Sequence, residues 1–169
     1  MDPIPEDVVD NTWRVMSRMK SARMTRLVEK MSIRQPVLLA YLMAAGEADF
    51  LTEEEKESLL YMGVVIWRIM SKGDRPLYQI TERLLDKMEV RNERMLEFLS
   101  GESSGDFISS VEMIFKNYNQ SQVLRYVVEG LMEEDEGNEF SEDGKGYMLV
   151  SLKTIIDCLD YAPKRKSKR

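Results

Sequence analysis

The sequence predicts an all-α fold, arranged as a single compact domain of about seven helices. Apolar residues recur at helical spacing along nearly the whole chain, and alternating runs of β-branched residues are absent. The chain has 169 residues, of which 43% are hydrophobic, enough to fill the core of one domain. The helical domain is expected to span residues 1–163, and the basic residues 164–169 are expected to form a disordered tail.

Two helices are expected at the N-terminal end, from about Glu6 to Lys20 and from Ser21 to Ile33. The second helix carries an apolar stripe at i, i+3, i+4 and i+7 spacing, made by Met24, Leu27, Val28 and Met31. The apolar stripes of the two helices do not stay in phase. We therefore predict a bend or break between Lys20 and Ala22.

The third and fourth helices have the clearest local signals. Pro36 suits the first turn of a helix that ends at Gly46. Thr52 and Glu55 then form a capping box at the start of the next helix. That helix contains a twelve-residue, nearly unbroken apolar run from Leu59 to Met70, which is too short for a bilayer span of roughly 20 residues. We expect this helix to lie buried at the centre of the fold and to end at Lys72-Gly73.

A long helix is expected from about Leu77 to Ser100, with basic residues along one border of its apolar face and acidic residues along the other. Charged borders of this kind are typical of coiled-coil-like or dimeric packing. The candidate interface residues are Arg83, Lys87, Met88, Arg91 and Met95. The alternative is a surface helix that packs on its own core and has solvated flanks.

Three shorter helices are expected at Phe107 to Lys116, Ser121 to about Glu133, and Gly146 to Tyr161. A weak internal repeat relates "QPVLLAYLMAAG", from Gln35, to "SQVLRYVVEGLM", from Ser121, at an offset of about 86 residues. Two related helix-connector-helix units are one interpretation. A chance coincidence of short helical patterns is the other.

The acidic stretch "EEDEGNEFSEDGKGY", Glu133 to Tyr147, invites comparison with a calcium-binding loop. When Gly144 is placed at the obligatory glycine position, Val150 falls where a bidentate glutamate is required. The stretch is therefore interpreted as an exposed, solvated connector. On this interpretation, Glu134 to Gly144 could be replaced by a short Gly/Ser loop with little loss of stability.

The composition excludes several kinds of catalytic site. The chain has no histidine, and Cys158 is its only cysteine, so it lacks the residues of Ser-His-Asp and Cys-His systems, usual zinc sites and an intramolecular disulfide. No cofactor is expected. Acids one helical turn apart could still hold Mg²⁺ against a triphosphate, as in all-α nucleotide pyrophosphohydrolases. The candidate metal ligands are Glu54, Glu57, Asp86 and Glu89, although the second pair reads Asp-x-x-Glu rather than Glu-x-x-Asp.

Positive charge is concentrated in two segments of a chain whose net charge is −6. Residues 11–35 carry seven basic side chains and one acid, and the tail "KRKSKR" carries five basic side chains. The candidate anion-binding residues are Arg23, Arg26, Lys30 and Arg34 on the second helix and Lys164, Arg165 and Lys166 in the tail. Nucleic acid, an anionic membrane surface or an acidic protein segment would suit these residues. The alternative is that the helix is salt-bridged to the acidic body.

These observations favour a non-catalytic protein that binds another macromolecule, most simply another protein or a second copy of itself. The acidic N-terminus does not have the pattern of a signal peptide, and no transmembrane segment is predicted, so a cytoplasmic location is expected. Thirteen methionines make the chain methionine-rich, which suits core packing and adaptable binding surfaces. The alternatives are the Mg²⁺-dependent nucleotide hydrolase and a nucleic-acid-associated regulator.

Overall fold

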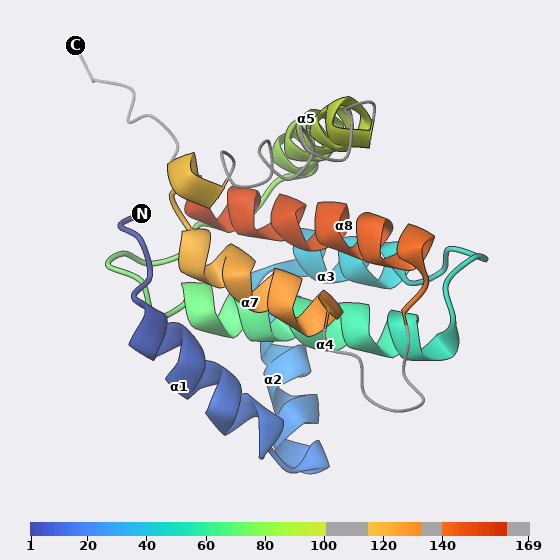
Figure 1. The fold of residues 1–169 in the computed structure, drawn as a ribbon. Coiled ribbons are helices and arrows are strands. Elements are labelled where there is room, and N and C mark those ends of the chain that lie inside the picture. The colour runs from blue at the N-terminus through green and yellow to red at the C-terminus, as the bar shows by residue number, and fades with distance from the viewer. Residues whose placement is uncertain (101–114, 133–139, 162–169) are drawn as a thin grey trace.

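A computed structural model of the chain describes residues 1–100, 115–132 and 140–161. Within these ranges all regular secondary structure is helical and no strand occurs, which confirms the predicted fold class (Figure 1). No helix in the described ranges is both long enough and apolar enough to cross a membrane. Most of the predicted helix at 107–116, and the predicted tail, lie outside the described residues.

The helices follow the predicted order, with different starts at two places. Their bounds are α1 (Glu6–Ser17), α2 (Ser21–Arg34), α3 (Pro36–Ala45), α4 (Glu53–Met70), α5 (Glu82–Ser100), α7 (Ser121–Met132) and α8 (Glu142–Asp160). The predicted break separates α1 from α2. The predicted capping box at the start of α4 is confirmed, since the Glu55 N–H donates to Thr52 Oγ1 and the Thr52 N–H donates to Glu55 Oε2.

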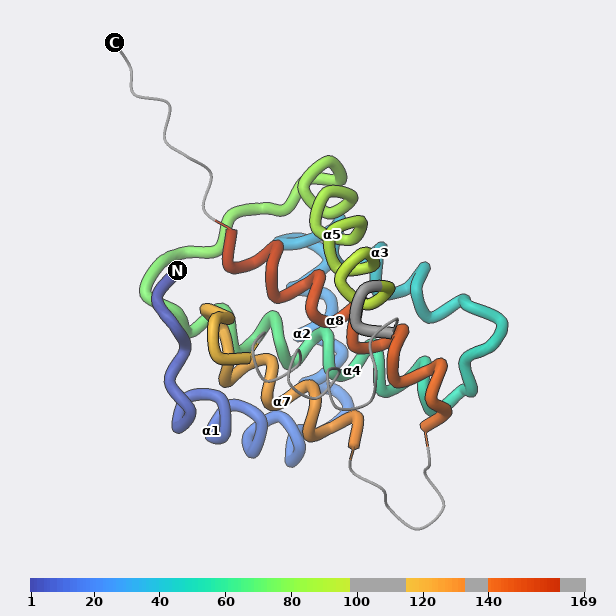
Figure 2. The backbone as a smooth tube through the Cα atoms, turned by 45° about the horizontal axis from the view of Figure 1, so that its top comes forward, coloured from blue at the N-terminus to red at the C-terminus, as the bar shows by residue number. Residues whose placement is uncertain are grey.

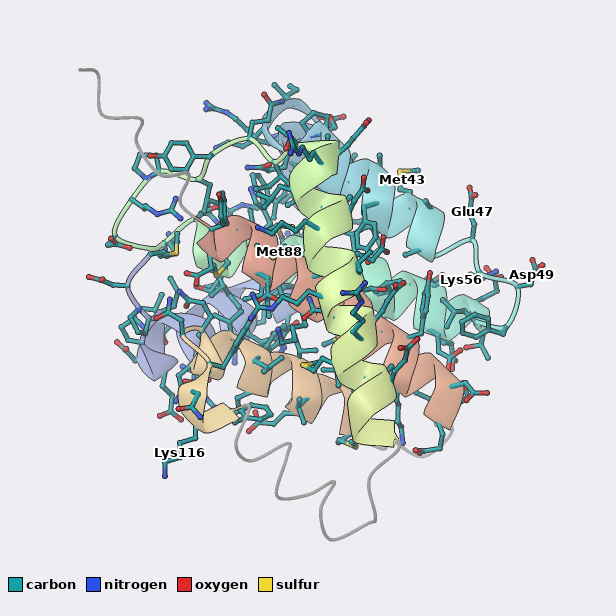
Figure 3. The ribbon with its side chains drawn as sticks, turned by 90° about the horizontal axis from the view of Figure 1, so that it is seen from above. Met43, Glu47, Asp49, Lys56, Met88 and Lys116 are labelled. Carbon is teal, nitrogen blue, oxygen red and sulfur yellow. The ribbon has the colours of Figure 1, made fainter. Side chains whose placement is uncertain are left out.

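Two antiparallel hairpins, α3–α4 and α7–α8, form the centre of the molecule. Their second helices, α4 and α8, run side by side in the same direction (Figure 2). Both helices carry fully buried apolar side chains, among them Leu59, Ile66 and Ile69 of α4 and Leu152, Ile155 and Ile156 of α8. Helix α5 lies across α8 (Figure 3), and α1 and α2 pack on α4. The two halves of the chain therefore have a similar arrangement. In the first half α1 packs on α4 and also contacts α7, and in the second half α5 packs on α8.

Two buried glutamines hold extended segments in equivalent ways, and we call these contacts the glutamine clamps. The Gln35 amide donates to the Tyr78 carbonyl oxygen at 2.7 Å and accepts from the Ile80 N–H at 3.0 Å. The Gln120 amide donates to the Asp2 carbonyl oxygen at 3.2 Å and accepts from the Ile4 N–H at 3.0 Å.

Each clamped segment leads directly into a helix, and the two sequences match. Residues 4–10 read "IPEDVVD" and residues 80–86 read "ITERLLD", sharing the pattern Ile-x-Glu-x-apolar-apolar-Asp. Ile4 and Ile80 are both buried in the core. The similarity of the two halves thus extends beyond the two predicted helix-connector-helix units to the segments that precede α1 and α5.

The predicted start of α5 at Leu77 is wrong, because the helix begins at Glu82. The Gln35 clamp binds backbone groups of the segment before it in an extended conformation, and this contact overrides the local helical spacing. The Leu84 N–H then donates to Thr81 Oγ1, which caps the new start.

The predicted start of α8 at Gly146 is also wrong, since this helix begins at Glu142 and Ser141 is its N-cap. The Ser141 N–H and Oγ both donate to Glu55 Oε1 at 2.8 Å, and Ser141 Oγ accepts from the Gly144 N–H at 3.0 Å. Glu55 is fully buried, so its carboxylate serves the first turns of both α4 and α8. The interpretation as a solvated connector therefore fails at Ser141 and Gly144.

Burial alone would raise the pKa of Glu55, but the hydrogen bonds from Thr52 and Ser141 outweigh it and hold that pKa below its ordinary value. Gly144 leaves the space that this carboxylate occupies, because a Cβ at this position would clash with Glu55 Oε1. We call the contact among Thr52, Glu55, Ser141 and Gly144 the double cap.

Candidate functional site

A groove of about 610 Å³ lies between α1, α2 and the C-terminal end of α4. Its apolar lining residues are Val8, Val15, Met16, Met19 and Leu27. The uncharged polar residues Asn11 and Thr12 also line it. Its cations are Arg23, Arg26, Lys30, Arg68 and Lys72. We call this hollow the basic groove.

The sequence of α2 places three of these cations along one side of the helix. Arg23, Arg26 and Lys30 are spaced three and four residues apart and therefore share a face, next to Leu27. Met31, on the same apolar stripe as Leu27, is fully buried and anchors the helix to the core. Arg68 comes from the last turn of α4 and Lys72 from the turn that follows it, near the helix C-terminus where cations are favoured by the helix dipole.

None of the five groove cations forms an ion pair or a side-chain hydrogen bond with another described residue, and no acid lines the groove. Arg125 on α7 behaves differently, since its guanidinium contacts Glu6, Asp10 and Glu129. The groove cations of α2 are therefore not salt-bridged to the acidic body within the described residues, in contrast to the alternative interpretation of the sequence.

The sequence-predicted anion-binding residues of α2 are largely brought together. Arg23, Arg26 and Lys30 line the basic groove, and Arg34 lines a neighbouring hollow with Lys30 and Arg68. Lys164, Arg165 and Lys166 lie outside the described residues. Arg68 and Lys72 were not among the predicted site residues, although basic residues near a helix C-terminus are a usable signal.

The four candidate metal ligands do not form a metal site. Glu54, Glu57 and Asp86 are exposed, and Glu89 is half-buried. Among the described residues there is no group of three or more Asp, Glu, Cys or His side chains that could hold a metal ion. Glu89 instead neighbours Tyr41, whose pKa is raised by burial and by that carboxylate.

The candidate interface residues of α5 have mixed surroundings. Met88 is buried and Met95 is half-buried, and α5 packs on α8 of the same chain. Arg83 and Lys87 are exposed and line a third hollow, while Arg91 is exposed elsewhere on α5. Self-association through this helix stays a prediction.

A buried polar network links α5 to α8, and the sequence analysis missed it. Lys153 Nζ donates to Asn92 Oδ1 at 2.9 Å and to Asp157 Oδ2 at 2.7 Å, while Tyr118 OH donates to Asp157 Oδ1 at 2.6 Å. Asn92 Nδ2 donates to Thr154 Oγ1 at 3.1 Å and to Asp157 Oδ2 at 3.0 Å.

Burial lowers the pKa of Lys153, and the Asp157 carboxylate opposes that effect. Burial together with Asp157 raises the pKa of Tyr118. Lys153 Nζ also lies 4.6 Å from the centre of the Tyr118 ring. The buried polar groups of the network are hydrogen-bonded to one another, so the network is interpreted as holding α5 against α8.

Comparisons of the chain with protein-family models, curated proteins and solved structures found no significant match. The basic groove, with its unpaired cations and apolar lining, is the candidate functional site.

Proposed function

We propose that the protein is a non-catalytic binding module that takes an acidic, amphipathic segment of a partner protein into the basic groove. The observation that carries this proposal is the set of five cations that line one groove without an ion pair among the described residues. Carboxylates of a partner would complement these cations and set the orientation of binding. Apolar side chains of the same segment would contact the apolar lining.

The apolar lining favours a protein segment over nucleic acid. Val15 is 60% exposed, and the half-buried Met19 adds a flexible side chain that adapts to different apolar partners. No aromatic residue lines the basic groove, whereas sequence-independent binding of single strands uses aromatic side chains for base stacking. The nucleic-acid-associated regulator is therefore the second candidate, supported by the same cations, since they would also suit phosphates.

The test is a titration of the full chain with a labelled acidic amphipathic peptide of about 15 residues, which would span about 50 Å in extended form. The variant Arg23→Glu/Arg26→Glu reverses two groove cations. We expect it to weaken binding about tenfold or more, since each close charge pair contributes a kilocalorie or more.

The matched control is Arg94→Glu/Lys116→Glu, which produces the same net charge from exposed positions that do not line the groove. Lys116 is labelled in Figure 3. We expect the control to bind the peptide like the parent chain. Equal weakening by both variants would indicate a nonspecific charge effect and contradict the proposal. Tighter binding of a single-stranded oligonucleotide than of the peptide would favour the regulator.

A further inference from the structure

We infer that the bound segment is longer than the basic groove and continues over the C-terminal end of α4 to the start of α5. This inference rests on the proposed function and names the path that the partner follows. A second hollow of about 510 Å³ shares Lys30 and Arg68 with the basic groove and adds Arg34. A third hollow of about 410 Å³ shares Gln79 with the second and adds Arg83 and Lys87.

The three adjoining hollows form a surface that we call the cationic track. Its eight cations are Arg23, Arg26, Lys30, Arg34, Arg68, Lys72, Arg83 and Lys87. No acid lines any of the three hollows, and none of these cations has an ion pair with a described residue.

The track is unusual for a chain whose net charge is −6. Other hollows on the described surface contain acids: Asp10 and Glu129 line one of them, and Glu29 lines another. A continuous row of unpaired cations raises the local potential and favours an anionic partner that extends along it.

The length of the track sets the length of the partner segment. Arg23 and Arg34 lie at opposite ends of α2 and are separated by about 16 Å along the helix axis. About five extended residues would cover that distance, and further residues are needed to reach Arg83 and Lys87. A short acidic peptide would therefore fill the basic groove alone, whereas a peptide of about twice its length would reach α5.

The lining of the basic groove, which is apolar and contains no aromatic residue, favours an acidic protein segment over a polynucleotide. Trp67 in the second hollow is buried. In the third hollow, the Arg75 guanidinium lies over the Tyr78 ring, 5.2 Å from its centroid. Tyr78 and Tyr161 in the third hollow are 50% and 38% exposed, so among the three hollows only the third offers bases exposed rings for stacking. Over the basic groove a polynucleotide would have no stacking surface, whereas the backbone and carboxylate groups of a peptide need none.

The experiment compares two acidic peptides that share the same apolar residues at one end, one of about 8 residues and one of about 16 residues. Binding is measured with the parent chain and with Arg23→Glu/Arg26→Glu, Arg83→Glu/Lys87→Glu and Arg94→Glu/Lys116→Glu. We expect Arg83→Glu/Lys87→Glu to weaken the long peptide about tenfold and to leave the short peptide unchanged. Arg23→Glu/Arg26→Glu should weaken both peptides, and the control should weaken neither.

Thermal melting of each variant checks the fold. Glutamate at positions 23 and 83 falls in the first turn of a helix, where acids are favoured, so folded variants are expected. If Arg83→Glu/Lys87→Glu leaves the long peptide unaffected while Arg23→Glu/Arg26→Glu weakens it, the inference is overturned and the proposed function stands. If neither peptide binds the parent chain, both fail. An oligonucleotide of equal charge that displaces the long peptide would overturn the choice of a protein partner.

Discussion

The cation buried between α5 and α8 differs in its surroundings from the cations of the basic groove. Lys153 is 3% exposed and donates hydrogen bonds to Asn92 and Asp157. The groove cations have no described partner and remain in contact with water. A charge removed from water destabilises the fold unless it is paired, whereas a hydrated cation can stay unpaired at little cost. The first arrangement therefore makes the fold depend on both partners of the buried pair, and the second leaves charge available for binding.

The largest expected effect comes from removing the buried cation. Lys153→Ala would leave the Asp157 carboxylate without its charged partner, and we expect a loss of about 3–5 kcal/mol in the free energy of unfolding. Urea denaturation measures this loss. Lys116→Ala, at an exposed position, serves as the control and should change stability by less than about 0.5 kcal/mol. Similar losses in the two variants would remove the distinction drawn between buried and exposed cations.

The second prediction concerns the double cap, which contains a buried and fully hydrogen-bonded acid. Gly144→Ala would place a methyl group against Glu55 Oε1, so the carboxylate would have to leave its three donors. We expect a loss of about 2 kcal/mol or more, measured by urea denaturation. In Gly146→Ala, the nearest contact would be an ordinary 3.9 Å to Leu96.

Gly146→Ala is the matched control, because it lies in the same helix and gains helix propensity of up to about 1 kcal/mol. A stabilised Gly144→Ala would show that the double cap is not formed as described.

The third prediction is the pH dependence that follows from the lowered pKa of Glu55. Because the folded-state pKa lies below the unfolded value of about 4.3, the ionised carboxylate contributes stability above that pH. This contribution is lost as the pH falls through the folded-state pKa.

We therefore expect the stability difference between the parent chain and Glu55→Gln to be about 1–2 kcal/mol at pH 7 and to narrow in acid. Urea denaturation at a series of pH values provides the measurement. A difference that stays constant down to pH values well below the ordinary range of glutamate would contradict the assignment.

The smallest expected effect on stability comes from the basic groove. Arg23→Glu/Arg26→Glu should change the free energy of unfolding by less than about 0.5 kcal/mol, since neither cation has a described partner to lose. Thermal and urea denaturation measure this. A loss above about 1 kcal/mol would place these cations with Lys153 as contributors to the fold.

Local signals allowed the sequence analysis to predict much of the fold. The capping box at Thr52 and the proline at the start of α3 act within one helical turn, and both helices begin where predicted. The starts of α5 and α8 depend on residues far away in the chain. Gln35 binds the Ile80 N–H across 45 positions, and Glu55 binds Ser141 across 86 positions. The local sequence around each helix start therefore does not predict these contacts.

The same distinction holds for the candidate site. The cations of α2 share one helix, so helical spacing alone predicted that they would lie together. Arg68 and Lys72 join them only through the packing of α2 on α4, which the sequence does not specify. The paired acids at Glu54 and Asp86 had equally regular spacing, but their helices do not bring them into one group.

The glutamine clamps impose an order on folding during synthesis. The clamp at Gln35 joins residues 45 positions apart, so both partners emerge from the ribosome early. The clamp at Gln120 holds Ile4 across 116 positions. At roughly 5–20 residues per second, Ile4 waits on the order of ten seconds for this partner to be made. The segment at Ile4 is therefore made long before it can dock, and a nascent chain stopped before Gln120 would lack the partner that holds this segment.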